Sequence, residues 1–365
     1  MIKKNFHLIL ATLLLASCDP FVNMGGYPDS VPTDREFYAQ RISHGDIPNW
    51  YREDWKEVVA PFTRSCKAFL KMSPNKKIST SYVDVTVGDM QTVCERWKRG
   101  RYHEASSSSI RGFFESNFEA KKIYSRGKPT GTITGYYEPY MKGTKFPTCE
   151  TLTPVYGLPF KEGHRNYTRA NIESGILTDK APVIYWVENP VDYFIMQIQG
   201  GGVILDEERG QTRLAYAGNN SHKFLGIGKI LKDKGVKLND WSMQSVKAWL
   251  KANPEAAKQY MKENPRYIYY TQVKSPGPLG TMGVPLTSGR SLAVDRTYYP
   301  LGLPMWIDFK TVDKETISKM AFAQDTGTAI KGGIRADYFW GTGSDAFAEA
   351  GRTHAQGSLY LLLPR

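Results

Sequence analysis

The sequence predicts a mainly β protein with helices, an α+β fold divided into two domains. Its 365 residues are too many for one ordinary hydrophobic core, which favours two domains. Helical patterns fill 35–125, runs of β-branched and aromatic residues begin at about Gly131, and the same order then repeats. This repetition indicates that one β-rich domain is inserted into another. We therefore expect an outer domain over 35–134 and 269–365 and an inserted domain over 135–268.

Turn and cap residues indicate where individual elements lie. Serines precede an apolar face in 107–123, which predicts one continuous helix. Residues 181–206 contain β-branched and aromatic runs cut by Gly, Pro and Asn, and they predict strands and turns. In the second helical stretch we expect a cap at Ser221. We also expect Asn253 to cap a helix whose first turn carries Pro254.

The N-terminal residues predict export and a lipid anchor. Two lysines precede an apolar run over 6–16, which is typical of a secretory signal and too short to span a membrane in the mature protein. The signal ends in Leu-Ala-Ser-Cys, which resembles the bacterial lipobox. Residues 1–17 are therefore the predicted signal peptide, and Cys18 is the predicted lipidated residue. Residues 18–34, rich in Pro, Gly and Asp, predict a flexible tether.

Anchoring and charge together limit the partners. A chain anchored by acyl chains lies on the periplasmic face of a bacterial membrane. The outer membrane is favoured, and Asp19 leaves the inner membrane open because it resembles a retention signal. The formal net charge of +12 favours nucleic acid, an anionic membrane or an acidic polymer as a partner. Export removes nucleic acid from this set, since little of it lies outside the cytoplasm.

Cysteine and histidine usage argues against a disulfide scaffold, a metal site and a cofactor. With Cys18 lipidated, Cys66, Cys94 and Cys149 permit at most one disulfide; a Cys66–Cys94 bond and free buried cysteines both stay open. No two histidines are three or four residues apart, and no cysteine pair has ligand spacing. The Gly-Ile-Gly at 226–228 lacks the third glycine of a dinucleotide loop. We expect no metal and no cofactor.

The segment 325–341, DTGTAIKGGIRADYFWG, carries the strongest candidate chemistry. Asp337 precedes an aromatic triplet, and burial against such groups raises the pKa of a carboxyl until it can donate a proton near neutral pH. Asp325 lies across a glycine-rich turn that allows close approach. Two other interpretations stay open: both aspartates cap loops, or Asp-Thr-Gly belongs to an aspartic protease. A single-chain protease needs two such motifs, and this sequence contains the motif only once.

Long motifs resemble the membrane-bound lytic murein transglycosylase A family over residues 50–365. They are TGYYEP (134–139), FIMQIQGGG (194–202), AYAGNNSHKFLGIGKILKDKGV (215–236), SMQSVKAW (242–249), VPLTSGRSLAVDRTYYPLGLPMWID (284–308) and DTGTAIKGGIRADYFWG (325–341). The resemblance implies a double-psi β-barrel in the outer domain, and DRTYYPLGLPMWI at 295–307 is similar to a motif of such barrels. It also implies a second β-barrel-like inserted domain and a groove between the two domains.

The resemblance implies a reaction as well. The family cleaves the β-1,4 bond between N-acetylmuramic acid and N-acetylglucosamine in peptidoglycan without adding water, because the muramyl C6 hydroxyl attacks C1 and leaves a 1,6-anhydro ring. Asp337 matches the general acid, which then becomes the general base. Asp325 matches a supporting electrostatic group. The expected partners are peptidoglycan strands and, through the anchor, the membrane; cell-wall enzyme complexes stay open.

Substrate contacts follow from the same motifs. The residues expected to contact sugar are Thr134, Tyr136, Tyr137, Gln199 and Gly200. Lys331 either pairs with Asp325 or a peptide carboxylate, or is a solvated turn lysine. The chain departs from the family at Thr328 and Gly201, where glycine and serine are common, and the second change removes a hydroxyl that binds sugar. A murein-binding lipoprotein without activity stays open as an alternative.

Overall fold

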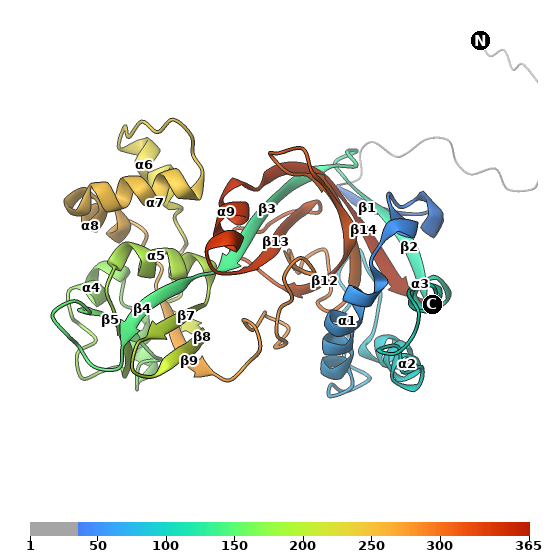
Figure 1. Cartoon of the computed structure of the whole chain (residues 1–365), viewed down its shortest axis with the longest axis horizontal. Coiled ribbons are helices and arrows are strands. Elements are labelled where there is room, and N and C mark those ends of the chain that lie inside the picture. The colour runs from blue at the N-terminus through green and yellow to red at the C-terminus, as the bar shows by residue number, and fades with distance from the viewer. Residues whose placement is uncertain (1–35) are drawn as a thin grey trace, which may run out of the picture.

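The computed structural model describes residues 36–365, which form two β-rich lobes side by side (Figure 1). The predicted signal peptide, the lipidation site Cys18, Asp19 and the tether lie outside the described residues. Within the described part of the chain, no helix is long and apolar enough to cross a membrane. The lobe on the right of Figure 1 combines the two ends of the described chain, and the lobe on the left contains its middle.

The right-hand lobe is an eight-stranded sheet that closes on itself. The strands are β1 (Phe37–Arg41), β2 (Phe118–Ser125), β3 (Gly131–Glu138), β10 (Ser291–Val294), β11 (Pro304–Lys310), β12 (Thr316–Asp325), β13 (Arg335–Thr342) and β14 (His354–Pro364). Their order is β1-β2-β14-β11-β12-β10-β13-β3, and β3 also pairs with β14, so the strands from β14 to β3 form a closed barrel. The β10–β12 and β13–β3 pairs are parallel, which brings distant parts of the sequence together.

Aromatic side chains fill the core of this lobe, and helices cover it. Trp50 packs against Trp55 and Trp306, and all three are buried. The covering helices are α1 (Trp55–Phe69), α2 (Val87–Arg99) and α3 (Ser107–Asn117), and two short 3-10 turns are η1 (His44–Asp46) and η2 (Trp50–Arg52). The side chains that cap the three helices are Asp54, Thr86 and Ser106.

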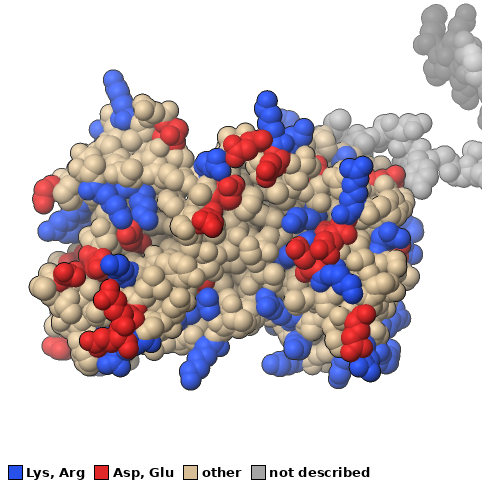
Figure 2. Space-filling model, in the orientation of Figure 1, with Lys and Arg blue, Asp and Glu red and all other residues tan. Residues whose placement is uncertain are grey.

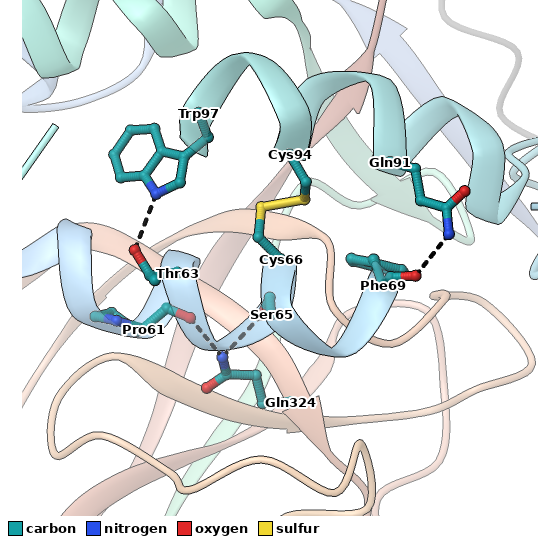
Figure 3. Close-up of a disulfide and its surroundings, with 9 residues drawn as sticks. All are labelled: Pro61, Thr63, Ser65, Cys66, Phe69, Gln91, Cys94, Trp97 and Gln324. Carbon is teal, nitrogen blue, oxygen red and sulfur yellow. Dashed lines mark hydrogen bonds between the residues drawn. A yellow bond between two sulfur atoms is a disulfide. The ribbon is translucent and has the colours of Figure 1, made fainter. Parts of the chain in front are cut away.

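A disulfide fastens the first two helices to each other (Figure 3). Cys66 of α1 bonds to Cys94 of α2, while Cys149 is free and exposed. Of the two states that the sequence left open, the structure therefore shows the Cys66–Cys94 bond. Beside it, the Gln91 amide donates to the Phe69 carbonyl at 2.9 Å, where α1 ends. The two helices thus form one rigid unit against the barrel.

The left-hand lobe is a six-stranded sheet with helices packed around it. Its order is β5-β6-β4-β7-β8-β9. The strands are β4 (Tyr140–Thr144), β5 (Thr153–Tyr156), β6 (Val183–Val187), β7 (Gly202–Asp206), β8 (Gly210–Asn219) and β9 (Ile268–Val273). The helices are η3 (Glu162–Asn166), α4 (Arg169–Glu173), α5 (Pro190–Gln199), α6 (Ile227–Asp233), α7 (Met243–Ala252) and α8 (Pro254–Lys262).

The chain crosses between the lobes at two places. It enters the left-hand sheet at Pro139, between β3 and β4, and it leaves that sheet after β9. Helix α9 (Ser344–Arg352) then follows β13 and packs on β3 and β13 in the right-hand lobe. We propose that this path of the chain defines an outer domain and an inserted domain, as the sequence predicts.

The helix predicted over 107–123 is too long. It ends at Asn117, and the remaining residues belong to β2, in which Phe118, Ala120 and Ile123 are buried. Strand β2 pairs with β1 on one side and with β14 on the other. Tertiary pairing on both sides therefore overrides the local helical preference of this stretch.

The strands predicted over 181–206 are interrupted by a helix, α5. Asn189 caps this helix by accepting hydrogen bonds from two backbone N–H groups, and Pro190 occupies its first turn. The apolar residues of α5 that pack together are Val191, Phe194, Ile195 and Ile198. Their helical spacing, rather than the abundance of β-branched residues, determines the structure.

The cap predicted at Ser221 is wrong, and the one at Asn253 is incomplete. Helix α6 begins after Gly226, and Ser221 instead has a left-handed backbone with φ of 61°. Asn253 does precede α8, which carries Pro254 in its first turn. However, the Asn253 side chain donates to the Trp249 carbonyl at 2.8 Å and does not cap α8.

Replacing Cys66 and Cys94 together by serine is expected to lower the free energy of unfolding by about 2–4 kcal/mol, because the cross-link restricts the unfolded chain. The bond joins residues separated by 28 positions. Equilibrium denaturant unfolding in non-reducing buffer measures the change. Cys149→Ser is the matched control and should leave unfolding unaltered, since Cys149 is free and exposed. A double variant as stable as the wild type would contradict this prediction.

Candidate active site

The strand register places the two predicted aspartates on one face of the barrel wall. Ala293 of β10 lies opposite Asp325 of β12 and also opposite Asp337 of β13. Residues directly opposite each other on neighbouring strands point to the same face, and two strand spacings separate the two backbones by about 10 Å. Because alanine stands between them, no large side chain separates the two carboxyl groups.

A β-bulge turns Asp325 towards this face. Along β12, Ala323 pairs with Leu292, and Asp325 pairs with the next residue, Ala293. Gln324 is therefore the extra residue of the bulge. Without it, the strict alternation of a strand would send the Asp325 side chain to the opposite face.

Gln324 is fully buried and fixes the bulge against helix α1 (Figure 3). Its amide nitrogen donates to the Pro61 carbonyl at 3.0 Å and to Ser65 Oγ at 2.9 Å. Its amide oxygen accepts from the Ser291 hydroxyl at 2.7 Å. A buried polar group without such partners costs about 1–3 kcal/mol, so this network strongly favours one position of the bulge. The disulfide-linked helix thus holds the residue that precedes Asp325.

Asp337 lies in surroundings that favour its protonated form. Thr134 is opposite it in the β13–β3 pair, and the Thr134 hydroxyl donates to Asp337 Oδ1 at 2.5 Å. Burial raises the pKa of Asp337 to about 6. The Thr134 hydrogen bond and the Arg335 charge oppose this rise, whereas the Asp325 charge adds to it. Asp337 keeps partial access to solvent, so a ligand can reach it.

Asp325 is surrounded by more hydrogen-bond donors. Its Oδ1 accepts from the backbone N–H and the hydroxyl of Thr281, each at 2.9 Å, and from the Thr326 N–H at 2.8 Å. The Tyr136 hydroxyl donates to Oδ2 at 3.1 Å. Burial raises the pKa of Asp325, and these hydrogen bonds lower it because they stabilise the carboxylate. The two carboxyl groups therefore differ, because Asp337 accepts from few hydrogen-bond donors and Asp325 accepts from many.

An apolar cluster lies beside the two carboxyl groups. Its members are Tyr136, Leu286, Ala293, Ile330 and Phe339. Phe339 follows Asp337 by two positions, on the same strand face, and its ring centre lies 5.1 Å from that of Tyr136. Burial, with the nearby Asp325 and Asp337 charges, holds the pKa of Tyr136 well above its usual value. The Tyr136 hydroxyl therefore stays protonated and remains a donor.

The other predicted contacts lie at the seam between the lobes or outside the site. Gln199 Oε1 accepts from the backbone N–H of the buried Tyr137 at 3.2 Å. Gly200 ends α5 with φ of +87°, a left-handed conformation that glycine adopts without strain. Lys331 is 69% exposed, and its Nζ lies 3.8 Å from Asp295 rather than at the aspartate pair. The structure thus brings Thr134 and Tyr136 to the aspartates and leaves Lys331 apart.

Sequence reasoning missed the ion pair that joins the lobes. Glu138, at the end of β3, is buried and accepts from Arg213 Nε at 2.7 Å and Nη2 at 3.1 Å. Arg213 belongs to β8 of the left-hand lobe, whereas the Thr342 hydroxyl, which donates to Glu138 at 2.8 Å, belongs to β13. The available signal in the sequence was the carboxylate of Glu138, which directly follows the two tyrosines of TGYYEP. Thr281 had no sequence signal, because its contact with Asp325 arises only from the fold.

Fold and site together define a two-lobed barrel protein with two unequal carboxyl groups close to the seam. Across residues 36–365, no group of three or more His, Cys, Asp or Glu side chains is arranged to hold a metal. The family model described as MltA specific insert domain matches residues 132–271, and the 3D domain model matches residues 290–363. Membrane-bound lytic murein transglycosylase A of Vibrio cholerae is 32% identical over 239 residues, which are 63% of this chain and 64% of that protein.

Solved structures agree with the family models. MltA from Neisseria gonorrhoeae has a TM-score of 0.78 at 29% identity, covering 90% of this chain and 93% of that one. Lytic transglycosylase LtgG of Burkholderia pseudomallei has a TM-score of 0.61 at 31% identity, covering 90% and 95%. The chain belongs to the membrane-bound lytic murein transglycosylase A family, as its motifs predict.

Asp337→Asn is expected to stabilise the fold at pH 7. The unfolded aspartate ionises near pH 4 and the folded one at about 6, so the native state binds the proton more tightly and stability falls as pH rises through this window. After allowance for solvent screening, the variant should gain about 1–2 kcal/mol at pH 7. Denaturant unfolding at pH 4 and pH 7 measures the gain. It should vanish at pH 4, and an equal effect at both pH values would contradict the raised pKa.

Proposed function

We propose that this protein is a lytic transglycosylase that cleaves the β-1,4 bond between N-acetylmuramic acid and N-acetylglucosamine in peptidoglycan without adding water. The observation that carries the proposal is the unequal carboxyl pair. Burial raises the pKa of Asp337 to about 6, while Asp325 is surrounded by donors that favour its ionised form. The name of the Vibrio cholerae relative supports both the substrate and the reaction.

In the first step, protonated Asp337 donates its proton to the glycosidic oxygen while the bond from muramyl C1 to that oxygen breaks. The N-acetylglucosamine leaves with the oxygen and the bonding electrons, and C1 develops oxocarbenium character. A pKa of about 6 suits this task, because a catalytic acid works best with a pKa near the operating pH. Since Thr134 occupies Oδ1, the proton resides on Oδ2.

In the second step, Asp337 is a carboxylate and removes the proton from the muramyl C6 hydroxyl. The C6 oxygen attacks C1 and closes the 1,6-anhydro ring, and Asp337 regains the proton that it lost in the first step. One carboxyl therefore serves as acid and then as base. Because the nucleophile belongs to the substrate, no second carboxylate is needed to activate water.

Asp325 supports the reaction by its charge. Its hydrogen bonds favour the carboxylate and oppose the rise in its pKa that burial causes. As a carboxylate, Asp325 stabilises the positive charge that develops at C1 and raises the pKa of Asp337. The Tyr136 hydroxyl fixes Asp325 Oδ2, and the Tyr136 ring belongs to the apolar cluster beside both carboxyls. Tyr136 thus connects the charged group with the wall of the site.

In this proposal, the sugar chain lies along a groove between the two lobes. Tyr136, Tyr137, Gln199 and Gly200 contact the glycan there, while Thr134 orients Asp337. The closed barrel with its two parallel pairs supports a double-psi β-barrel for the outer domain. The exposure of Lys331 suits contact with a peptide carboxylate better than a role beside Asp325.

The substrate and the anchor place this activity on the periplasmic face of a bacterial membrane, with the outer membrane favoured. Cys18 carries the lipid, and the excess of basic over acidic residues, which persists after Lys3 and Lys4 leave with the signal peptide, attracts the carboxylates of murein stem peptides. This attraction is screened over about 8 Å at physiological ionic strength, so it concentrates the polymer close to the surface.

Digestion of purified sacculi, followed by mass spectrometry, tests the proposed reaction. The wild-type protein should release muropeptides that end in 1,6-anhydromuramic acid. Asp337→Asn should slow their release by about 10²–10⁴-fold, because it removes the acid and the base. Asp325→Asn should slow release by a smaller factor. Asp313→Asn is the control, since Asp313 is exposed and outside the pair.

Three other results would each overturn the proposal. Products with water-containing reducing ends would identify a hydrolase. Binding to sacculi without any cleavage by the wild type would identify a murein-binding lipoprotein. Cleavage of peptide bonds that is lost in Asp325→Asn would identify an aspartic protease.

A further inference from the structure

The left-hand lobe holds a cavity of about 250 Å³ that the proposed reaction does not use. It lies where β4 and the beginning of α5 meet, and its lining includes Tyr140, Lys142, Glu188 and Asp192. Figure 2 shows basic and acidic side chains close together on the face of this lobe, over α5 and α7. The lining residues Lys142, Glu188 and Asp192 give the cavity charges of both signs.

Two of these charges have no partner among the described residues. The Glu188 N–H donates to the Lys142 carbonyl at 3.4 Å, so the two residues are neighbours. Both side chains are exposed, yet they form no ion pair with each other or with any residue within 36–365. Beside them, the Tyr140 ring is 45% exposed. The cavity thus offers a free ammonium, a free carboxylate and an aromatic face.

Helix α7 packs on α5 and brings positive charge to Asp192, which lines the cavity. Lys247 Nζ lies 2.9 Å from Asp192 Oδ1, and Lys251 Nζ lies 2.8 Å from Asp192 Oδ2. Two ammonium groups on one carboxylate leave one positive charge in excess. A ligand for this cavity should therefore carry carboxylates, and it should also carry an ammonium group for Glu188. An uncharged sugar would leave these charges unused.

The cavity adjoins the same seam as the aspartate pair. The Tyr140 ring packs directly on Gly343, just after β13. A Cβ atom added to this glycine would lie only 2.8 Å from the ring. Tyr140 follows Thr134, the partner of Asp337, by six residues of nearly continuous strand, which span about 20 Å. A polymer that lies along the seam can therefore contact both places at once.

We propose that this cavity binds the peptide branches of the substrate, short peptides that carry both carboxylate and ammonium groups. This inference rests on the proposed function, because peptidoglycan is the polymer that would present such branches at the seam. Carboxylates meet Lys142 and the excess charge of the lysine pair, an ammonium meets Glu188, and the chain packs on Tyr140. The lobe thereby selects glycan strands that carry peptides over bare strands.

Kinetics on two forms of one substrate test the proposal. Soluble glycan strands from sacculi are used with their peptides and after an amidase has removed them, and anhydro ends are counted. Lys142→Ala and Glu188→Gln should each raise KM about fivefold on peptide-bearing strands, the size expected for an exposed ion pair. Both should keep the wild-type KM and kcat on bare strands, which also shows that they fold. Lys237→Ala, an exposed lysine of the same lobe outside the cavity, should match the wild type on both substrates.

The outcomes separate this inference from the proposed function. An equal rise of KM on both substrates would show that the cavity binds sugar, and an unchanged KM on both would show that it binds neither. Either result overturns the peptide site while the transglycosylase proposal stands. A wild-type protein that releases no anhydro ends from either substrate would overturn the proposed function, and the peptide site with it.

Discussion

The pairing of β3 with β13 is the contact on which the rest of the structure depends. It brings Thr134 against Asp337 although 203 residues separate them in the sequence. The same strand β3 ends at Glu138, whose ion pair with Arg213 joins the two lobes. One strand therefore orients the proposed acid, closes the barrel and holds the two lobes together. A shift of one residue in this pairing would turn Thr134 away from Asp337.

A second constraint acts on Asp325 from the other side. The bulge at Gln324 and its hydrogen bonds to α1 decide which face of β12 carries the carboxylate. Helix α1 is itself held to α2 by the Cys66–Cys94 disulfide. Helix α1 thus fixes the strand that carries Asp325, while β3 fixes Asp337 and adds one donor, Tyr136, to Asp325. One carboxyl therefore collects donors while the other stays poor in them. In the proposed mechanism, that inequality separates the proton donor from the charged supporting group.

Some of this site could be predicted from residues alone. The aromatic triplet after Asp337 indicates burial, and the TGYYEP motif contains both Thr134 and Tyr136, which contact the aspartates. Other features could not be predicted, because they depend on tertiary pairing. Thr281 meets Asp325 only through the fold. The bulge at Gln324 exists only in register with β10, and local patterns of β-branched residues hid the helix α5.

Direct titration of the Asp337 carboxyl tests the central claim. Carbon NMR of the aspartate carboxyls should show one resonance that titrates at about pH 6 and disappears in Asp337→Asn. In Thr134→Val that titration should move to higher pH, because the hydroxyl that stabilises the carboxylate is lost. A carboxyl at position 337 that titrates near pH 4, as an ordinary exposed aspartate does, would contradict the account.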